Sequence, residues 1–386
     1  MSKYVALLGN TPQLSLAELQ ALVFSDVNLV GNHLAIFSLD NEQEVGKLQA
    51  KLGGVFKIMR MVKPLTPDSF ELQKEIADYL LESLNNDNKS SSKIKFSLTF
   101  FGEIQIEIKP QIVKKMIVDE GFSSRYIETE QWGLSSIVIN KQNNLFDLFI
   151  AMIDDELWLL ETIAVSDAVE WIQRDRDKPY ISGKKGMLPP KLARIMVNLG
   201  LGQLKQKSKE ESLLLYDPFC GTGTVLLEAL LRGCQVVGSD IDAEAVDGTR
   251  LNLQWLNNQQ HHSFKYQLFE ADVVSGPNHL QDQKVDLIVT EPFLGKPNPQ
   301  DSELKNIYIG LEGLYLGAFK AWIKLLHKGS TVVIVFPYVE SSFGRFDLQS
   351  LIDKLSRFGY TLVVNPIDYH REKAEVKRQI LVFRYQ

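Results

Sequence analysis

One stretch near the middle of the chain limits the fold more than any other. The apolar residues Leu213–Leu215 lead into Tyr216-Asp217-Pro218-Phe219-Cys220-Gly221-Thr222-Gly223-Thr224, and a second apolar run begins at Val225. This order predicts a strand, a glycine turn and the start of a helix. Gly221 and Gly223 lack a Cβ and can adopt a positive φ, so a ligand can approach the backbone and the first N–H groups of the helix. The stretch therefore predicts a ligand-binding turn in an α/β sheet.

A second acidic residue supports a nucleoside ligand over a plain tight turn. Asp240 ends the next predicted strand, 23 residues after Asp217. In doubly wound sheets a carboxylate about 20 residues beyond the glycine loop accepts hydrogen bonds from ribose hydroxyls. The dinucleotide pattern G-x-G-x-x-G requires a third glycine where this chain has Leu226. We therefore expect a nucleoside cofactor with an amino-acid head group, because Asp217 can accept from an ammonium group.

Composition sets the class of protein. The chain has 386 residues and two cysteines, so we expect two or three domains and no disulfide framework. No apolar run approaches the roughly 18 residues of a membrane span, and Met1–Gly9 lack a secretion signal. These features predict a soluble, cytoplasmic protein without a membrane segment. The six histidines show no metal-ligand spacing, and Gly-x-Ser-x-Gly and Walker loops are absent, so we expect no metal site, serine hydrolase or nucleoside triphosphatase.

The connector before the glycine loop has a charge of its own. The chain carries 42 basic and 48 acidic residues, a net charge of −6, whereas residues 166–211 carry a net charge of +4. Arg174, Arg176 and Lys178 precede Pro179 in a segment that we expect to be extended. A solvated linker and a stripe that tracks a phosphate backbone both fit this pattern.

A helix should follow in the same connector. Pro190 is suited to the first helical turn and Gly200 to the C-cap. The apolar residues between them fall on one helical face, and they are Leu192, Ile195, Met196 and Leu199. We expect this face to pack on the sheet that opens with Leu213.

The first 165 residues predict two α/β units. Residues 1–65 alternate strands and helices like a ferredoxin-like unit, and residues 66–165 repeat the alternation after the polar loop at Asn85–Lys93. Within the second unit we expect a helix at Lys109–Glu120 and a strand at Ser135–Asn140.

The segment after Asp240 continues the α/β winding. A helix is expected at 243–257, and strands at 264–269 and 285–290 end near Asp272 and Glu291. The carboxyl ends of these strands form the edge where α/β proteins bind ligands. Asp272 is placed to meet an adenine amine, and an ordinary exposed aspartate is the alternative.

The order of these features resembles the THUMP-domain tRNA guanosine-N2-methyltransferases, which are class I S-adenosylmethionine-dependent RNA methyltransferases. The resemblance rests on Asp217–Thr224, on Gly186-Met187-Leu188-Pro189-Pro190-Lys191-Leu192-Ala193, and on Gln13–Leu19 and Leu52–Ile58. It implies a doubly wound methyltransferase sheet with a C-terminal antiparallel hairpin in residues 212–386, preceded by a half in which residues 66–165 form a THUMP-like domain that binds tRNA.

With S-adenosylmethionine as cofactor, the motif and the following strand ends supply eight candidate ligands. These are Asp217, Phe219, Gly221, Gly223, Thr224, Asp240, Ile241 and Asp272.

Glu291, Pro292 and Phe293 are the candidate catalytic residues. Methylation of an exocyclic amine needs acceptors for the amine hydrogens and a ring that stacks on the base. The family carries Asp-Pro-Pro followed by Tyr or Phe where this chain has Glu291-Pro292-Phe293-Leu294. The acid is therefore one methylene longer, the fixed φ of the second proline is lost, and the aromatic ring is lost or displaced by one residue.

We expect transfer to the N2 amine of a tRNA guanosine, with Glu291 accepting from the amine and Phe293 contacting the base. One alternative is a homologue that binds tRNA and cofactor but is inactive or needs an activating partner subunit. The other is methylation of adenine N6 in DNA, which shares the motif but does not need a THUMP half.

Overall fold

The computed structural model describes residues 2–23, 25–86, 93–102, 104, 106–142, 144–181, 187–204, 212–281, 283–369 and 374–386. The expected loop residues 87–92, Gly186 of the proline motif and residues 370–373 lie outside this range. The chain divides into two compact units. The first contains Met1–Pro12, Val23–Lys51 and Val55–Glu170, and the second contains Gln13–Leu22, Leu52–Gly54 and Trp171–Gln386.

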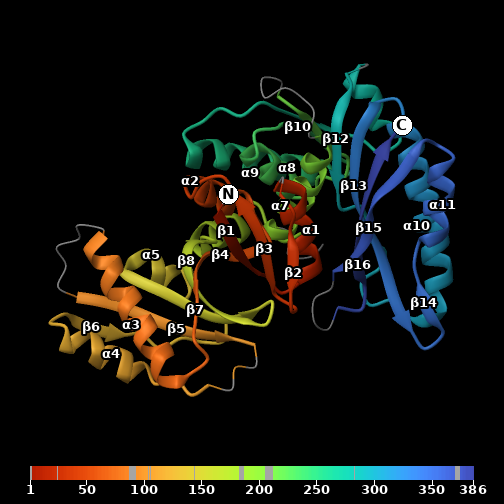
Figure 1. Cartoon of the computed structure of the whole chain (residues 1–386). Coiled ribbons are helices and arrows are strands. Elements are labelled where there is room, and N and C mark those ends of the chain that lie inside the picture. Colours follow the sequence, from red (N-terminus) through yellow and green to blue (C-terminus); the bar gives the residue numbers. More distant parts are fainter. Residues whose placement is uncertain are drawn as a thin grey trace. The chain divides into compact units, whose positions relative to one another are not determined.

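The first unit is built on one eight-stranded sheet in the order β2-β3-β1-β4-β8-β7-β5-β6 (Figure 1). Its strands are β1 (Ser2–Leu8), β2 (Asn28–Val30), β3 (Leu34–Leu39), β4 (Val55–Pro64), β5 (Lys93–Phe101), β6 (Ser123–Tyr126), β7 (Leu145–Ile153) and β8 (Glu156–Val165). Strand β4 pairs antiparallel with β8, so the predicted units 1–65 and 66–165 share a single sheet.

The helices of the first unit agree with the sequence except at one place. They are α2 (Gln43–Lys51), α3 (Ser69–Asn86), α4 (Pro110–Asp119) and α5 (Ser136–Lys141). The strand expected at Ser135–Asn140 is wrong, because Ser135 caps a helix there and accepts a hydrogen bond from the Val138 N–H. Strand β7, which we did not expect, lies between β5 and β8.

A polar cluster lies inside this first sheet. The carboxylate of Asp147 on β7 accepts from Lys57 Nζ at 2.6 Å and from the hydroxyls of Ser97 and Thr162 at 2.7 Å. Lys57 and Asp147 are both buried. Each acid oxygen has a donor, as buried charges require.

The second unit contains the doubly wound sheet, in the order β11-β10-β9-β12-β13-β16-β15. Its strands are β9 (Leu214–Asp217), β10 (Gln235–Asp240), β11 (Tyr266–Glu270), β12 (Val285–Thr290), β13 (Leu326–Ser341), β15 (Tyr360–Tyr369) and β16 (Lys377–Tyr385), with β14 (Gly344–Phe346) beside β13. The first five are parallel, and β16 pairs antiparallel with both β13 and β15. The predicted C-terminal hairpin is therefore confirmed.

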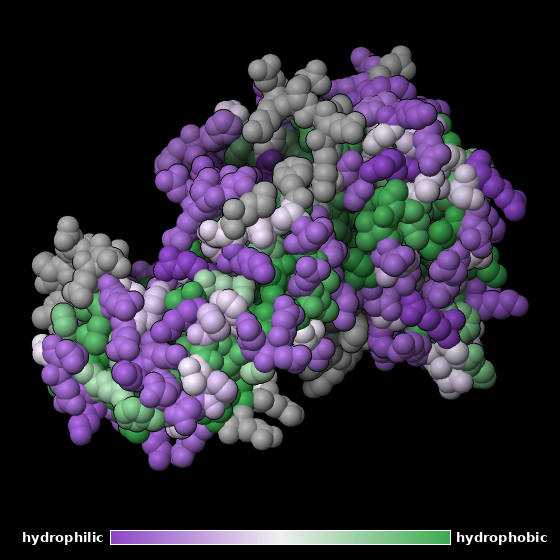
Figure 2. Space-filling view, viewed as in Figure 1, coloured by the Kyte–Doolittle hydropathy of each residue, from purple (hydrophilic) through white to green (hydrophobic). Residues whose placement is uncertain are grey.

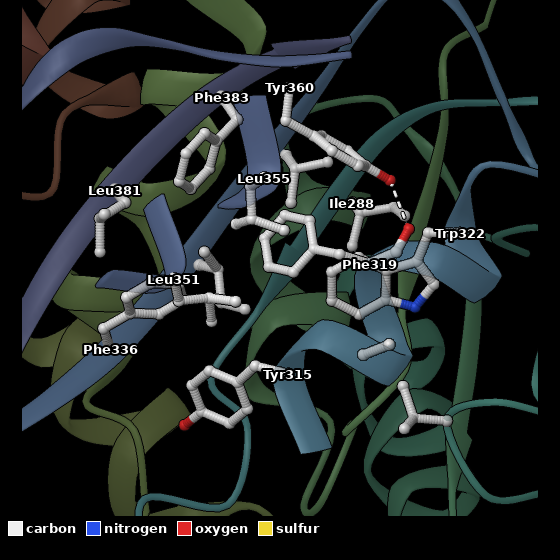
Figure 3. Packing of buried hydrophobic residues seen from close by; sticks show 14 of the residues in the cluster. Ile288, Tyr315, Phe319, Trp322, Phe336, Leu351, Leu355, Tyr360, Leu381 and Phe383 are labelled. Atoms are coloured by element: carbon white, nitrogen blue, oxygen red, sulfur yellow. Dashed lines mark hydrogen bonds between the residues drawn. The ribbon is translucent and has the colours of Figure 1, made fainter. Parts of the chain in front are cut away.

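Helices cover both faces of this second sheet. They are α7 (Pro190–Gln203), α8 (Thr224–Leu231), α9 (Ala243–Gln260), α10 (Asp301–Trp322) and α11 (Gln349–Ser356). The core under α10 is aromatic: Phe319 packs against Trp322 and Tyr360, and the Tyr360 hydroxyl donates to the Phe319 carbonyl (Figure 3). The Phe319–Tyr360 contacts fix α10 against β15, the edge strand of the same sheet.

The predicted apolar face of α7 is buried, but the helix does not end at Gly200. Leu192, Ile195, Met196 and Leu199 belong to one core cluster with α8 and the sheet. Gly200 lies inside α7, where an added Cβ would be 2.9 Å from Leu287. This glycine therefore allows close packing of helix on strand rather than capping the helix.

Helix α1 (Pro12–Leu22) also packs in the second unit from Gln13 onward. Its buried Glu18 accepts from the N–H groups of Gly53 and Gly54, both at 2.8 Å, and from Asn198 Nδ2 at 2.6 Å. This contact gives a structural reason for two segments that carried the family resemblance.

Polar side chains cover much of the face seen in Figure 2. In the parts of the chain that the structure describes, every helix is too short or too polar to cross a lipid bilayer.

Candidate active site

The glycine turn after β9 has the backbone that the sequence predicted. Gly221 and Gly223 have φ angles of 52° and 77°. An added Cβ at Gly223 would also lie 2.8 Å from Thr249, so glycine is required there twice over. Helix α8 starts at Thr224, directly after the turn. Phe219 is half-buried against the aromatic core.

Asp240, at the end of β10, holds this turn. Its Oδ2 accepts from the Gly221 N–H at 2.9 Å, and its Oδ1 accepts from the Asp242 N–H at 3.1 Å. Because β9 and β10 are parallel neighbours, both acids lie at the carboxyl edge of the sheet. The carboxylate expected for a ribose thus also shapes the glycine loop.

Asp217 is buried and only partly satisfied. Its Oδ1 accepts from the Thr290 hydroxyl at 2.6 Å and from the Phe219 N–H at 3.2 Å. Among the described residues no donor contacts its Oδ2. Burial raises the pKa of Asp217 to about 7, and the nearby charges of Asp240 and Glu291 act in the same direction. This acid therefore has one oxygen available for a cationic ligand.

Three exposed apolar side chains follow the ends of three of the parallel strands, β10, β11 and β12. Ile241 after β10 is 72% exposed, Val274 after β11 is 53% exposed and Phe293 after β12 is 61% exposed. Val274 was missed by the sequence analysis, because a single valine in a loop carries no motif. Apolar groups at this edge are suited to flat aromatic ligands.

Asp272 lies in the loop after β11 and is exposed. It accepts from the N–H groups of Val274 and Ser275 and from the Ser275 hydroxyl. These hydrogen bonds lower the pKa of Asp272, and the bond from the Ser275 hydroxyl has the largest effect. The acid thus orders the loop that presents Val274.

Glu291 has a partner that the sequence did not reveal. Arg378 on β16 donates through Nε to Glu291 Oε1 at 2.5 Å, and each side chain is 15% exposed. Within the described residues no donor contacts the other oxygen, Oε2. The acid is therefore anchored by one oxygen.

The backbone beyond Glu291 is also held. Pro292 is buried, and the Phe293 carbonyl accepts from the Tyr315 hydroxyl of α10 at 2.9 Å. Gly295 ends the turn with a φ of 94°. The Phe293 ring projects to solvent from a fixed turn.

The expectation of an extended connector is wrong. Ala168–Ile172 form helix α6, and Gln173–Asp177 continue as a π-helical turn. Arg174 is buried and donates to Glu228 Oε1 at 2.9 Å, and Lys178 is buried and donates to Thr224 Oγ1 at 3.1 Å. Burial lowers the pKa of Lys178. These two side chains are bonded inside the second unit and cannot form a basic stripe along a phosphate backbone. Arg176, in contrast, is exposed.

A cavity of about 670 Å³ lies elsewhere in the second unit. It is lined by Ala17, Leu199, His327 and Arg384 among others, and by none of the predicted site residues. His327 and Arg384 are at the amino end of β13 and the carboxyl end of its antiparallel partner β16, so the cavity opens at the edge opposite the glycine turn. We therefore do not assign it to the active site.

Comparisons with known proteins fit this geometry. Residues 181–337 match the family model described as the RMKL-like methyltransferase domain. The chain is 31% identical over 252 residues to a protein from Methanocaldococcus jannaschii named tRNA (guanine(10)-N2)-dimethyltransferase, covering 62% of this chain and 68% of that one. A protein of the same name from Methanothermobacter thermautotrophicus is 34% identical over 206 residues, covering 53% of this chain and about half, 52%, of that one. The chain belongs to the tRNA guanine-N2 methyltransferase family.

A solved structure supports the fold. The crystal structure of TrmN from Thermus thermophilus matches with a TM-score of 0.55 at 15% identity and covers all of both chains. At this identity the likeness shows the fold alone, and it confirms the predicted class I methyltransferase fold.

The matched domain identifies S-adenosylmethionine as the methyl donor. The observed turn fits this molecule, because it combines an approachable backbone at Gly221 and Gly223 with an open acid oxygen at Asp217. The roles of single residues and the domain boundaries at 65, 165 and 211 stay predictions. Among the described residues no three His, Cys, Asp or Glu side chains gather as metal ligands.

Proposed function

We propose that this protein transfers a methyl group from S-adenosylmethionine to the N2 amine of a guanosine in tRNA. The observation that carries the proposal is Glu291, which is anchored through Oε1 and open at Oε2. It follows Thr290, whose hydroxyl binds Asp217 of the glycine turn at 2.6 Å. The names of the two archaeal relatives support the same substrate.

We assign the cofactor roles to acidic, glycine-turn and apolar residues at the carboxyl edge of the sheet. The bound cofactor supplies a methyl group on a sulfonium. Asp217 Oδ2 accepts from its ammonium group and Asp240 accepts from the ribose hydroxyls. The glycine turn lets the cofactor approach the backbone, with Phe219 and Thr224 on either side of it. Ile241 and Val274 contact the adenine ring, and Asp272 accepts from its amine.

Glu291 and Phe293 act on the guanine. Oε2 of Glu291 accepts a hydrogen bond from the N2 amine and aligns the nitrogen lone pair with the methyl group. The exposed Phe293 ring stacks on the extruded base. Buried Pro292 keeps the two side chains at a fixed separation.

The first unit binds the tRNA in this proposal, as a THUMP-containing half. A tRNA substrate also favours a cytoplasmic location. The alternative is a tRNA-binding homologue that needs a partner subunit for transfer, and the departure from the family motif at Phe293 and Leu294 supports it.

The proposal is tested by methylation of an unmodified tRNA transcript with labelled cofactor, followed by nucleoside analysis. Glu291→Ala should lower kcat by roughly 10²–10³-fold, the effect of removing one transition-state hydrogen-bond partner. Glu291→Gln should also impair transfer but keep cofactor affinity, and Glu291→Asp should be impaired less than Glu291→Ala.

Glu340→Ala is the matched control. Glu340 on β13 pairs with Lys377, which precedes Arg378 on β16. The substitution therefore also removes an ion pair between β13 and β16, but outside the motif. Wild-type protein that binds cofactor and tRNA but forms no methylguanosine over hours contradicts the enzyme proposal. Full activity in Glu291→Ala contradicts the role of Glu291 alone.

A further inference from the structure

The turn after β12 lacks the second proline of the family motif, yet two residues from distant parts of the second unit hold it. Arg378 comes from β16, where it pairs with Pro337 of β13. Tyr315 comes from α10 and is buried with its ring 5.3 Å from that of Phe336. One contacts the side chain of Glu291 and the other contacts the backbone of Phe293.

We propose that Arg378 and Tyr315 are positioning residues for methyl transfer, Arg378 by orienting the Glu291 carboxylate and Tyr315 by fixing the Phe293 backbone. The inference rests on the proposed function, because it takes Glu291 and Phe293 as the groups that meet the guanine. Neither positioning residue touches the substrate in this proposal.

The geometry at Arg378 explains its part. The Nε–Oε1 contact restrains one oxygen of the Glu291 carboxylate and leaves Oε2 as the acceptor. Glutamate has one more rotatable bond than the aspartate of the family motif, so without Arg378 the carboxylate has more orientations to search. Misplacing a reacting group by about 1 Å can cost roughly 10²-fold in rate.

Tyr315 replaces a restraint that the sequence lacks. Proline would have fixed φ at residue 293, and the hydroxyl of Tyr315 instead fixes the carbonyl of the same residue. Burial raises the pKa of Tyr315 well above its usual value, so the phenol stays protonated and donates. The exposed Phe293 ring then leaves the turn in one direction.

The same helix provides a matched control for Tyr315. Tyr308 lies seven positions earlier on α10, about two turns away, and is also buried. Its hydroxyl has no hydrogen-bond partner in the described part of the chain. Tyr308→Phe and Tyr315→Phe therefore remove the same atom, and only the second removes a bond to the turn.

Turnover on tRNA tests Tyr315. Tyr315→Phe should lower kcat about tenfold or more with KM for cofactor and tRNA unchanged, and Tyr308→Phe should match wild type. Amide hydrogen exchange should speed up at residues 293–296 in Tyr315→Phe alone. Equal kcat and equal exchange in the two variants would overturn the inference for Tyr315.

A double-mutant cycle tests Arg378. Arg378→Met should lower kcat more than Arg378→Lys, and the control Lys377→Met should have little effect. In a Glu291→Ala background, Arg378→Met should cause no further loss, because the carboxylate that it orients is gone. Additive losses would show a structural role and overturn the inference.

The exchange experiment separates this inference from the proposed function. If the wild-type protein shows no turnover but exchange is faster in Tyr315→Phe alone, the contact of Tyr315 with the turn is supported and the enzyme proposal is rejected. Normal turnover in Tyr315→Phe and Arg378→Met would keep the enzyme and reject the positioning roles.

Discussion

Two buried aspartates, one in each unit, have opposite surroundings. Asp147 on β7 is 2% exposed and receives donors on both oxygens, including the ammonium group of Lys57. Asp217 on β9 is 1% exposed, and among the described residues it receives donors on Oδ1 only and has no ion-pair partner. The burial of the two acids is therefore similar, and their hydrogen bonds and charged partners differ.

The difference separates a structural acid from a binding acid. The oxygens of the buried Asp147 accept from an ammonium group and two hydroxyls of the same sheet, so Asp147 serves the first sheet. An acid with an open oxygen and a raised pKa favours a cation that arrives from outside, which is the reason for the proposed role of Asp217 in cofactor binding. Glu291 also has one oxygen without a donor among the described residues, although Arg378 pairs with the other.

The largest expected effect is on the structural acid. Asp147→Asn leaves the buried Lys57 without a counter-ion and should lower the free energy of unfolding by about 3–5 kcal/mol. Urea unfolding monitored by amide hydrogen exchange in β5 and β7 measures this loss. Asp154→Asn, an exposed residue with φ 49°, is the control. A loss no greater than in the control would contradict the distinction.

At Asp240, which pairs with the glycine turn, the expected effect falls on cofactor binding. Asp240→Ala removes the ribose acceptor and the partner of the Gly221 N–H, and should weaken S-adenosylmethionine binding by about 1.5–3 kcal/mol. Titration calorimetry gives the affinity, and Asp247→Ala on α9 is the exposed control. Unchanged affinity, or tight NAD binding without S-adenosylmethionine binding, would reject the site.

Asp217 should make cofactor binding depend on pH. An ammonium ligand prefers the ionised acid, so with a pKa of about 7 the affinity should rise about tenfold between pH 6 and pH 8. Binding at pH 7 should release about half a proton per cofactor, which calorimetry in buffers of different ionisation enthalpy detects. A pH-independent affinity would place the ammonium group elsewhere.

Asp217 should also make the stability of the fold depend on pH. Stability should fall as pH rises, whereas cofactor affinity should increase. Its pKa is higher in the folded state than the value of about 3.9 in an unfolded chain. Its contribution is therefore complete below about pH 3.9 and is lost as pH rises through about 7. Asp217→Asn should flatten this decline in thermal-unfolding scans across that range.

The smallest effect is expected in the connector, where Arg176 is exposed and Arg174 is paired with Glu228. Arg176→Ala should change the free energy of unfolding by no more than about 0.5 kcal/mol. If Arg176 contacts a phosphate, the variant should also reduce the salt dependence of tRNA binding by about one unit of slope. Arg250→Ala on α9 is the control, and equal slopes would leave Arg176 a solvated side chain.

Local chemistry explains what the sequence could predict. The glycine turn at Gly221 and Gly223 is encoded by adjacent residues, so its conformation and the position of Asp240 could be predicted. The ion pair of Glu291 with Arg378 joins residues 87 positions apart, and no motif announces it. Arg174 is similar, because its partner Glu228 is 54 positions away.

The strand prediction at α5 was wrong for a different reason. The β-branched residues Ile137, Val138 and Ile139 favour a strand, but the cap at Ser135 fixes a helical turn. Propensity gave the wrong answer because the cap and the backbone hydrogen bonds from Val138 and Ile139 to the Ser135 carbonyl form a helical turn here.

The place of α1 in the second unit has a consequence for synthesis on the ribosome. Glu18 is synthesised well before Asn198, which completes its hydrogen bonds and follows 180 positions later. At about 5–20 residues per second, the helix waits on the order of ten to forty seconds for that partner. The chain also changes unit at five junctions, after residues 12, 22, 51, 54 and 170. A fragment that starts at Trp171 would therefore lack a piece of its own core, and co-translational folding of the catalytic unit depends on a helix that is made long before the rest of that unit.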